Sequence, residues 1–261
     1  MSYPDIFIPS RGRPTELRTP YALPRRLQEC VYVVVRYDEF DAYNDADEDR
    51  DFQFLVLPKD FTGGLSATRQ WILDQADGQV HIQLDDDFTG INIKVDCKKF
   101  GGVKKTSPTE FCRCFDQLLY WLANGFDHVS FTDRVSSARP SKVPYYDNGR
   151  IAQALFYNRY AIKRAGARFD RVALMQDLDM NLQLLEAGYR SRTSTRWSYN
   201  HRAEDAAGGC ALYRTDDLKA VVGQQMMKLH PGVTELKEKQ KYGRTYFYMK
   251  THWKKALKEK A

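Results

Sequence analysis

Three aspartates in succession, Asp85, Asp86 and Asp87, follow directly on the apolar run Ile82–Leu84. Carboxylates this close repel one another, and each resists ionisation at neutral pH unless a cation lies between them. Carboxylate oxygens are preferred ligands of Mg²⁺ and Mn²⁺, and oxygens of water and phosphate complete the coordination of these ions. The triplet therefore predicts a Mn²⁺ or Mg²⁺ site that works on a phosphorylated substrate.

Side chains alternate along an extended chain, so Asp85 and Asp87 are expected on one side and Asp86 on the other. We predict that Asp87 is the main metal ligand and that Asp85 lies nearby, on the metal or on a ribose. The alternative is a hydrated acidic turn in which the aspartates only cap the backbone that follows.

A second acidic stretch, Asp38–Asp51, repeats the aspartate spacing. It does not match an EF-hand calcium loop, because Arg50 stands where glycine is needed and Val56 where the bidentate glutamate belongs. We interpret this stretch as a solvated surface loop.

The elements that must position these residues alternate between strand and helix through the first hundred residues. Apolar runs predict strands at 5–9, 31–37, 52–58 and 80–84, and a helix at 65–76 follows Gly63-Gly64. This order predicts an α/β fold with a mostly parallel, Rossmann-like central sheet covered by helices. Ligands bind such sheets beyond the carboxyl ends of the strands, where both the triplet and Pro9–Arg13 fall.

The second half is less regular. Ser107-Pro108-Thr109-Glu110 predicts a capped helix start at 107–124, and a strand is expected at 127–132. A long polar loop at 133–150 has a length typical of functional loops. Helices are predicted at 176–187 and 215–229, with irregular structure at 196–209.

Bulk properties describe an ordinary globular chain. It has 261 residues, of which 43% are hydrophobic, and this length suits one large α/β domain. No apolar run approaches membrane-spanning length and no signal peptide is evident, so we expect no membrane association and a cytoplasmic protein. The five cysteines are scattered, and we expect all of them to be free thiols.

The net charge of +6 is concentrated in the last 27 residues, Glu235–Ala261, with eight lysines and one arginine against three glutamates. Aromatic residues are interleaved with the cations, which suits a polyanion with stackable bases. Nucleic-acid contact is expected at Lys241, Arg244, Lys250, Lys254 and Lys255. The alternative is a solvated amphipathic terminal helix.

Four motifs in order carry a family resemblance: Pro9–Arg13, Val33–Val35 with Glu39, Gly63–Arg69, and Gln83–Asp87. Together they resemble the nucleotide-sugar half of a GT-A glycosyltransferase. The residues in these motifs are similar to those of the TET/JBP-associated glycosyltransferases of bacteriophages, which are thought to glycosylate hydroxymethylated pyrimidines in DNA. The resemblance covers roughly residues 5–215.

The resemblance implies roles for individual residues in donor binding. The loop residues Pro9, Ser10, Arg11 and Arg13 would hold a uracil-type base and the diphosphate, together with Asp85 and Asp86. Glu39 would accept a hydrogen bond from the ribose or base, and Arg69 would lie at a helix N-terminus facing the diphosphate. The alternative for Arg11, Arg13, Glu39 and Arg69 is an ordinary surface position.

The same resemblance places the chemistry in the second half. Asp177 would be the catalytic base, although Gln176 stands where inverting enzymes often carry glutamate. Its alternative role is helix capping, and Asp179 is the weaker choice for the base. His201 would join the metal; the alternative is a structural histidine.

These implications combine into one expected function. A sugar would move from a UDP-sugar to a hydroxyl, and the expected acceptor is 5-hydroxymethylpyrimidine in double-stranded phage DNA. The glycosyltransferase domain would span 1–234, with a nucleotide-sugar half at 1–100 and an acceptor half at 101–234, followed by a basic extension at 235–261. The alternatives are transfer to a protein, lipid or small molecule, a nucleotidyltransferase, and a DNA-binding accessory protein without catalysis.

Overall fold

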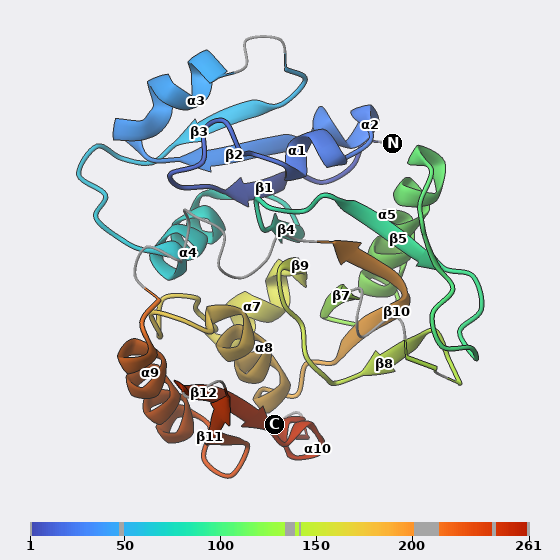
Figure 1. The fold of residues 1–261 in the computed structure, drawn as a ribbon, viewed down its shortest axis with the longest axis vertical. Coiled ribbons are helices and arrows are strands. Elements are labelled where there is room, and N and C mark those ends of the chain that lie inside the picture. The colour runs from blue at the N-terminus through green and yellow to red at the C-terminus, as the bar shows by residue number, and fades with distance from the viewer. Residues whose placement is uncertain are drawn as a thin grey trace.

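The computed structural model describes residues 2–46, 50–133, 139–140, 142–200, 214–241 and 244–259. Its centre is a ten-stranded sheet with the order β3-β2-β1-β4-β9-β7-β10-β5-β6, in which β8 also pairs with β10 (Figure 1). The strands are β1 (Ile6–Pro9), β2 (Val31–Val35), β3 (Gln53–Val56), β4 (Val80–Leu84), β5 (Gly90–Lys94), β6 (Val103–Lys105), β7 (His128–Asp133), β8 (Tyr145–Asp147), β9 (Ala154–Asn158) and β10 (Ser191–Asn200).

The sheet is mostly parallel, as the sequence predicts. Strands β1 to β4 pair in parallel, and β10 pairs in parallel with β7. Strand β9 runs against β4 and β7, and β5 and β8 run against β10. The carboxyl ends of β1 and β4 therefore meet at one edge, and this edge positions the Pro9–Arg13 loop beside the aspartate triplet.

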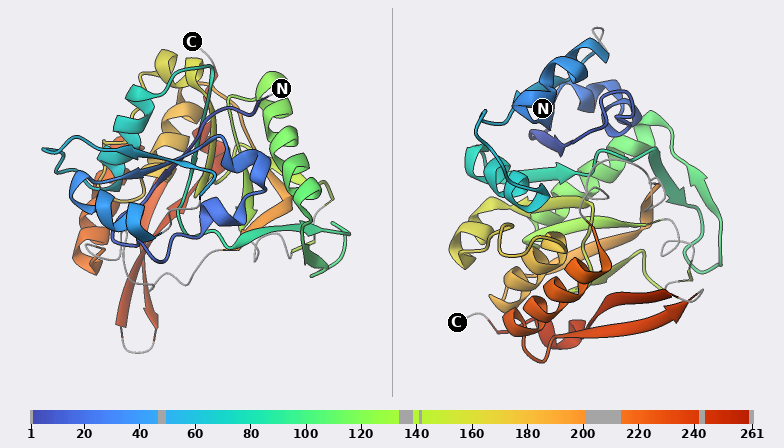
Figure 2. Two further views of the ribbon diagram at one scale, coloured as in Figure 1. Left: turned by 90° about the horizontal axis from the view of Figure 1, so that it is seen from above. Right: turned by 60° about the vertical axis from the view of Figure 1, so that its left-hand side comes forward.

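Helices cover both faces of this sheet (Figure 2). The structure contains α1 (Thr19–Ala22), α2 (Arg25–Gln28), a 3₁₀ turn η1 (Tyr37–Glu39), α3 (Phe40–Ala46), α4 (Leu65–Gln75), α5 (Pro108–Ala123), α7 (Arg159–Ala165), α8 (Gln176–Glu186), α9 (Asp216–Leu229) and α10 (Trp253–Ala256). Strand β1 shows the two-sided burial: Ile6 and Ile8 pack in the cluster that includes α5, whereas Phe7 packs against Ile72 of α4.

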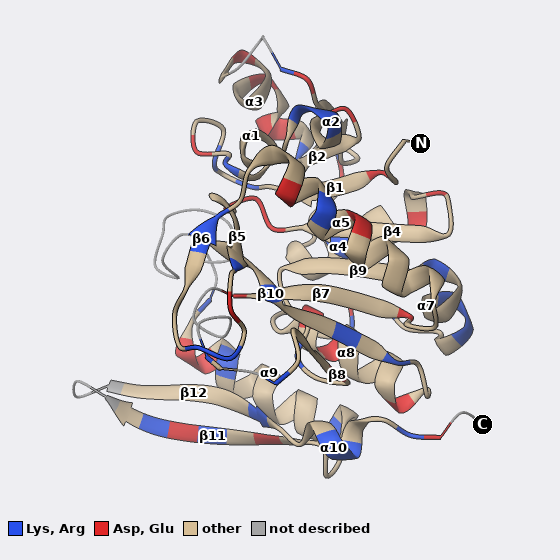
Figure 3. Cartoon of the chain, turned by 90° about the vertical axis from the view of Figure 1, so that its right-hand side faces the viewer, with Lys and Arg blue, Asp and Glu red and all other residues tan. Residues whose placement is uncertain are grey.

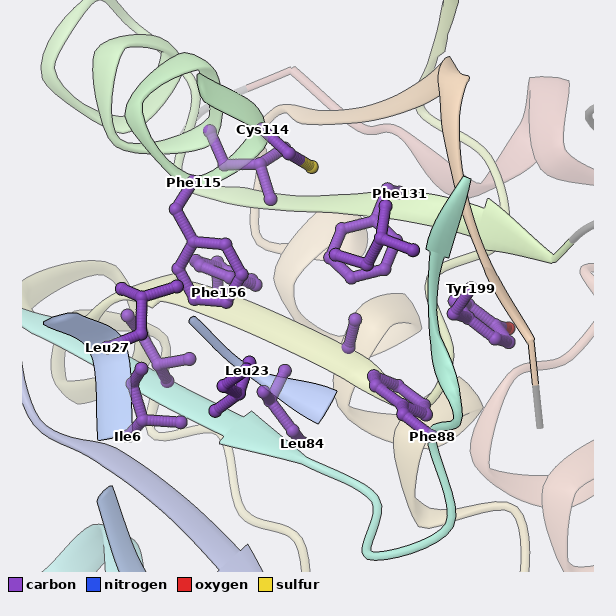
Figure 4. Close-up of a cluster of buried hydrophobic side chains, with 14 of the residues drawn as sticks. Ile6, Leu23, Leu27, Leu84, Phe88, Cys114, Phe115, Phe131, Phe156 and Tyr199 are labelled. Carbon is purple, nitrogen blue, oxygen red and sulfur yellow. The ribbon is translucent and has the colours of Figure 1, made fainter. Parts of the chain in front are cut away.

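The cluster on the α5 side reaches the loop after β4 (Figure 4). Phe88, the residue after the triplet, is buried and stacks on Tyr199 of β10 with ring centroids 4.9 Å apart. Phe131 of β7 contacts both rings edge to face. Burying a phenylalanine contributes roughly 1.5–3 kcal/mol, so the core itself fixes where the acidic turn ends.

Local signals explain most helix boundaries. Ser107 and Glu110 form the predicted capping box at the start of α5, and the helix ends at Ala123 before Asn124-Gly125. Two predictions were wrong. The stretch Asp38–Asp51 is not simply a solvated loop, because η1 and α3 occupy 37–46 and bury Tyr43. The segment expected to be irregular from Arg196 onward begins as strand, because β10 continues to Asn200 by pairing with β5.

The C-terminal part forms a two-stranded hairpin of β11 (Thr234–Lys241) and β12 (Arg244–Thr251). A terminal amphipathic helix was therefore the wrong alternative for this segment, although the short α10 follows. One face of the hairpin packs on α9, where Leu236 fills the space beside Gly223. The expected boundary between residues 234 and 235 falls inside β11, and the division into domain and extension stays a prediction.

Two smaller predictions concern chemistry and environment. The cysteines within the described residues, Cys30, Cys97, Cys112 and Cys114, are free, and Cys210 lies outside them. Within the same part of the chain, no helix is long and apolar enough to cross a membrane.

Candidate active site

A cavity of about 810 Å³ opens at the carboxyl ends of β1 and β4. Its lining includes the loop after β1, the start of α4, the aspartate triplet, residues 150–153 before β9, the start of α8, and strand β12. It brings together Asp85, Asp86, Asp87 and Asp177 with Pro9, Ser10, Arg11, Arg13 and Arg69. Most residues that the sequence singled out for donor binding and catalysis thus share one cavity.

The turn that presents the triplet is held by Thr19, which is fully buried. Its hydroxyl donates to the backbone carbonyl of Asp85 at 2.5 Å and accepts from the backbone N–H of Phe88 at 2.9 Å. The N–H of Thr19 donates to the carbonyl of Asp86 at 3.1 Å. One threonine therefore fixes both ends of the acidic turn, which limits how far the three carboxylates can separate.

Asp86 points toward the loop after β1. Its carboxylate accepts from the Ser10 hydroxyl at 2.6 Å and from Nη1 of Arg13 at 2.7 Å. Tyr43 supports this arrangement from α3, because its hydroxyl lies 2.8 Å from that of Ser10 and accepts from the N–H of Arg13 at 3.0 Å. Burial raises the pKa of Tyr43 to about 12, so this phenol stays protonated at neutral pH.

Arg69 and Asp85 form an ion pair beneath the cavity. Only 1% of Arg69 is exposed, so its guanidinium holds the triplet from below. This is a different contact from the diphosphate contact that the sequence suggests. Burial raises the pKa of Asp85 to about 7; Arg69 lowers it, while Asp87, Asp177 and Asp86 raise it further. Burial is thus the main reason why Asp85 resists ionisation, and the neighbouring carboxylates add to it.

The donor set can be tested against a divalent cation. Among the described residues, no group of three histidine, cysteine, aspartate or glutamate side chains is arranged as a complete metal site. Magnesium commonly takes only one or two carboxylates from a protein and completes its shell with water and substrate phosphates. All three aspartates line the cavity, with Asp86 paired to Arg13 and Asp85 paired to Arg69. Asp87, with Asp85 beside it, matches that pattern. His201 lies outside the described residues.

Asp177 and Asp179, two positions apart on α8, have different surroundings. Asp177 lines the cavity, and its Oδ1 accepts from the N–H of Leu178 at 2.8 Å. Asp179 is fully buried behind the cavity, where it accepts from Gln183 at 2.7 Å and lies 2.8 Å from Nε2 of His230. Met175, just before α8, has φ = 60°, a left-handed conformation that is uncommon for this residue type and costs roughly 1–3 kcal/mol.

The remaining predicted residues are distributed more widely. Oε2 of Glu39 accepts from the N–H of Gly12 at 3.0 Å, so this glutamate braces the loop after β1 and does not itself line the cavity. Lys250, Lys254 and Lys255 are exposed on β12 and α10. The side chains of Lys241 and Arg244 lie outside what the structure describes.

Several residues that line or support the cavity were not predicted from the sequence. Thr19 and Tyr43 carry no motif, although the spacing of Phe40, Tyr43 and Ala46 is a helical signal inside the acidic stretch. Arg150 and Gln153 line the cavity from the end of the long polar loop, whose length was the only signal for it. Gln153 also has a left-handed backbone with φ = 62°, and its carbonyl accepts from the N–H of Asp85 at 3.0 Å.

Comparison with known families decides what this arrangement belongs to. A model of the TET-associated glycosyltransferases matches residues 4–209. The chain belongs to this family. The TET-associated glycosyltransferase match spans the strands of the central sheet, the triplet and Asp177, and it confirms the family resemblance and an enzyme of the glycosyltransferase class. Comparison with curated protein sequences finds no match.

Solved structures of similar fold include GT-A glycosyltransferases. S. aureus TarS 1-349 in complex with UDP-GlcNAc has a TM-score of 0.53 at 12% identity, over 85% of this chain and 66% of that one. Our chain thus spans just under two thirds of that protein. Glucosyl-3-phosphoglycerate synthase from Mycobacterium tuberculosis, in complex with Mg²⁺ and UDP, has a TM-score of 0.51 at 10% identity, over 95% and 86% of the two chains. At these identities the likeness concerns the fold alone.

Proposed function

We propose that this TET-associated glycosyltransferase moves a sugar from a UDP-sugar to a hydroxyl group of 5-hydroxymethylpyrimidine in double-stranded DNA, with Mn²⁺ or Mg²⁺ bound. The observation that carries the proposal is the common cavity, whose lining brings together the triplet, Arg11 and Arg13 of the loop after β1, Arg69 of α4, and Asp177. Two GT-A structures of similar fold hold UDP-GlcNAc or UDP, which supports a uridine donor.

The donor would bind against the loop after β1. Pro9 and Ser10 offer backbone groups to a uracil-type base, and Arg11 offers a guanidinium to the diphosphate. Arg13 is held in place by Asp86, so the loop is arranged before the donor arrives. Preorganised cations cost little reorganisation when charge develops on the leaving diphosphate.

Asp87, with Asp85 beside it, would hold the divalent cation. That cation supplies charge neutralisation for the departing UDP. Arg69 keeps Asp85 in place through their ion pair, and Thr19 fixes the backbone on which both aspartates stand. The chain therefore controls the position of both carboxylates from buried side chains.

Asp177 would take the proton from the acceptor hydroxyl in an inverting transfer. The hydroxyl oxygen forms a bond to the anomeric carbon, the bond from that carbon to the diphosphate oxygen breaks, and UDP leaves with the electron pair. The fixed backbone at Met175 sets the direction in which α8 presents Asp177.

The C-terminal hairpin supports a DNA acceptor. Cross-strand register places Lys239 opposite Tyr246 and Lys237 opposite Tyr248, so cations and aromatic rings share one face. Tyr246 and Tyr248 are 38% and 49% exposed and also line the cavity. Lysines that neutralise phosphates beside rings that stack on bases are typical of nucleic-acid surfaces. Lys250, Lys254 and Lys255 extend this surface toward α10.

Product analysis tests the proposal. The protein is incubated with Mn²⁺, a panel of UDP-sugars and duplex DNA that contains 5-hydroxymethylcytosine, and the digested nucleosides are weighed by mass spectrometry. We expect a hexosyl mass on the hydroxymethylated nucleoside, with none on matched DNA that contains only cytosine. UDP-sugar turnover onto a protein, lipid or small molecule, with no modified nucleoside for any donor, would replace the DNA acceptor by one of those classes.

A further inference from the structure

The tip of the β5–β6 hairpin, residues 95–102, is a second place where aromatic and cationic side chains meet. Phe100 is 78% exposed and Val95 is 69% exposed. An apolar ring left in water forgoes the roughly 1.5–3 kcal/mol that its burial would contribute. Two such side chains on one short turn therefore indicate a surface that another molecule covers.

The backbone of this tip is a defined turn. The N–H of Val95 donates to the carbonyl of Gly102 at 3.1 Å, and Oδ1 of Asp96 accepts from the N–H of Lys98 at 2.9 Å. Gly101 and Gly102 both adopt left-handed conformations, with φ of 77° and 66°, that favour glycine. These contacts hold Phe100 at the outer end of the hairpin.

The surroundings of Phe100 are positively charged. Residues 95–105 contain four lysines, Lys98, Lys99, Lys104 and Lys105, against the single acid Asp96. Lys99 lies 3.9 Å from Asp96 and Lys104 lies 3.9 Å from Glu110. Both lysines are exposed, and long ion pairs at the surface contribute little free energy. The excess positive charge complements a polyanion.

The tip lies within reach of a duplex whose target base enters the cavity. Strand β5 begins three residues after Asp87 and is five residues long. At about 3.3 Å per residue it extends roughly 15 Å, which is less than the ~34 Å of one DNA turn. Figure 3 shows the β5–β6 and β11–β12 hairpins on the same side of the molecule, while α7 lies on the opposite side.

We propose that the β5–β6 tip is a second contact to duplex DNA, in which Phe100 inserts between bases next to the target and Lys98 and Lys99 contact phosphates. The inference rests on the proposed DNA acceptor. Enzymes that act on a base take it out of the stack, and apolar wedges between base steps help to open the stack. The β11–β12 face would then hold the duplex from across the cavity.

The test measures binding of the full chain to a fluorescent duplex that contains 5-hydroxymethylcytosine, with 2-aminopurine beside it. Phe100→Ala should weaken binding about 5- to 100-fold, which is the range of base–aromatic stacking, and should remove the rise in 2-aminopurine fluorescence. Phe100→Trp should restore both. Lys98→Gln/Lys99→Gln should lower the slope of log affinity against log salt by about 2, since each phosphate contact contributes about 0.9.

Matched controls come from α7. Tyr160→Ala removes another exposed ring, and Lys163→Gln/Arg164→Gln removes two exposed cations. Both should bind DNA like the wild type, and Phe100→Ala should keep the wild-type rate of UDP-sugar hydrolysis without DNA.

Wild-type affinity and fluorescence in Phe100→Ala would overturn the wedge while leaving the DNA acceptor standing. A wild-type chain that binds no DNA would overturn the acceptor and the wedge together. Binding to phosphatidylserine vesicles that depends on Phe100, with no effect of Phe100 on DNA, would assign the tip to a lipid surface instead.

Discussion

Nη1 of Arg13 lies 2.7 Å from Oδ1 of Asp86, and this ion pair joins the loops that follow strands β1 and β4. Both side chains are about nine-tenths buried. The pair therefore connects the expected nucleotide loop to the expected metal loop, together with the hydrogen bond from Ser10 to the same carboxylate.

Replacing Arg13 should damage donor binding and stability together. Arg13→Met leaves a buried carboxylate without its cation, which typically costs about 3–5 kcal/mol, and the loop loses its arrangement. UDP affinity measured by calorimetry should fall at least ~10-fold. The matched control is Arg25→Met, which breaks an exposed pair with Asp51 and should leave UDP affinity unchanged. Unaltered UDP binding in Arg13→Met would separate this loop from the donor.

Replacing Thr19 tests how strongly the acidic turn depends on the buried hydroxyl that holds it. Thr19→Val keeps the shape but leaves the carbonyl of Asp85 and the N–H of Phe88 without their partner. We expect a loss of about 1–3 kcal/mol in unfolding free energy and a lower kcat/KM. Thr109→Val, at an exposed position of α5, should change neither quantity. Full activity of Thr19→Val would mean that the turn keeps its geometry without this hydroxyl.

The two aspartates of α8 should respond differently to the same change. Asp177→Asn should bind UDP like the wild type and lose about 10²- to 10⁴-fold in turnover, because the base is removed. Asp179→Asn disturbs the buried contact with His230 and should lower the melting temperature. Retained turnover in Asp177→Asn would exclude this residue as the base.

His230 gives the molecule a pH-dependent stability. Its ring is buried, which disfavours the charged form, but Asp179 at 2.8 Å and Glu186 at 3.1 Å outweigh burial and raise its pKa. Arg171, 3.4 Å from Asp179, is a further charge in contact with this cluster. A histidine whose pKa is raised by folding contributes its full stabilisation of the folded state below the unfolded pKa of about 6.5. This contribution is lost as the pH rises through the pKa of the folded state.

Urea unfolding of wild type and His230→Gln between pH 5.5 and 8.5 measures this contribution. The difference in unfolding free energy should be largest at pH 5.5 and shrink as pH rises, by up to about 1.4 kcal/mol per unit of pKa difference. A difference that is constant across this range would show that the histidine contributes only packing.

Residues next to each other in sequence were the most predictable. The run from Val80 through Asp87 carries its own strand, turn and carboxylates, so the strand and the acidic turn at its carboxyl end were predictable from this run alone. Asp177 and Asp179 were also expected to face different surroundings, because they are two positions apart on a helix, and the structure places Asp177 at the cavity and buries Asp179.

Contacts between segments that are far apart in the chain could not be predicted from the sequence. Nothing around Thr19 indicates that its hydroxyl serves a carbonyl 66 residues later. Arg69 shows the same limit, because its helix position suggested an anion, whereas tertiary packing buries it against Asp85. The hairpin at 234–251 was missed because its mixture of lysines and aromatic residues suits both an exposed helix and an exposed strand. Only the pairing of β11 with β12 distinguishes the two.

The most direct measurement compares sugar transfer by wild type and Asp87→Ala, with hydroxymethylated DNA, UDP-sugar and a titration of Mn²⁺. The wild type should require the cation and lose activity with a chelator. Asp87→Ala should be folded, bind DNA like the wild type, and transfer no sugar at any Mn²⁺ concentration. Transfer at the wild-type rate by Asp87→Ala would contradict the assignment of the triplet as the centre of the reaction.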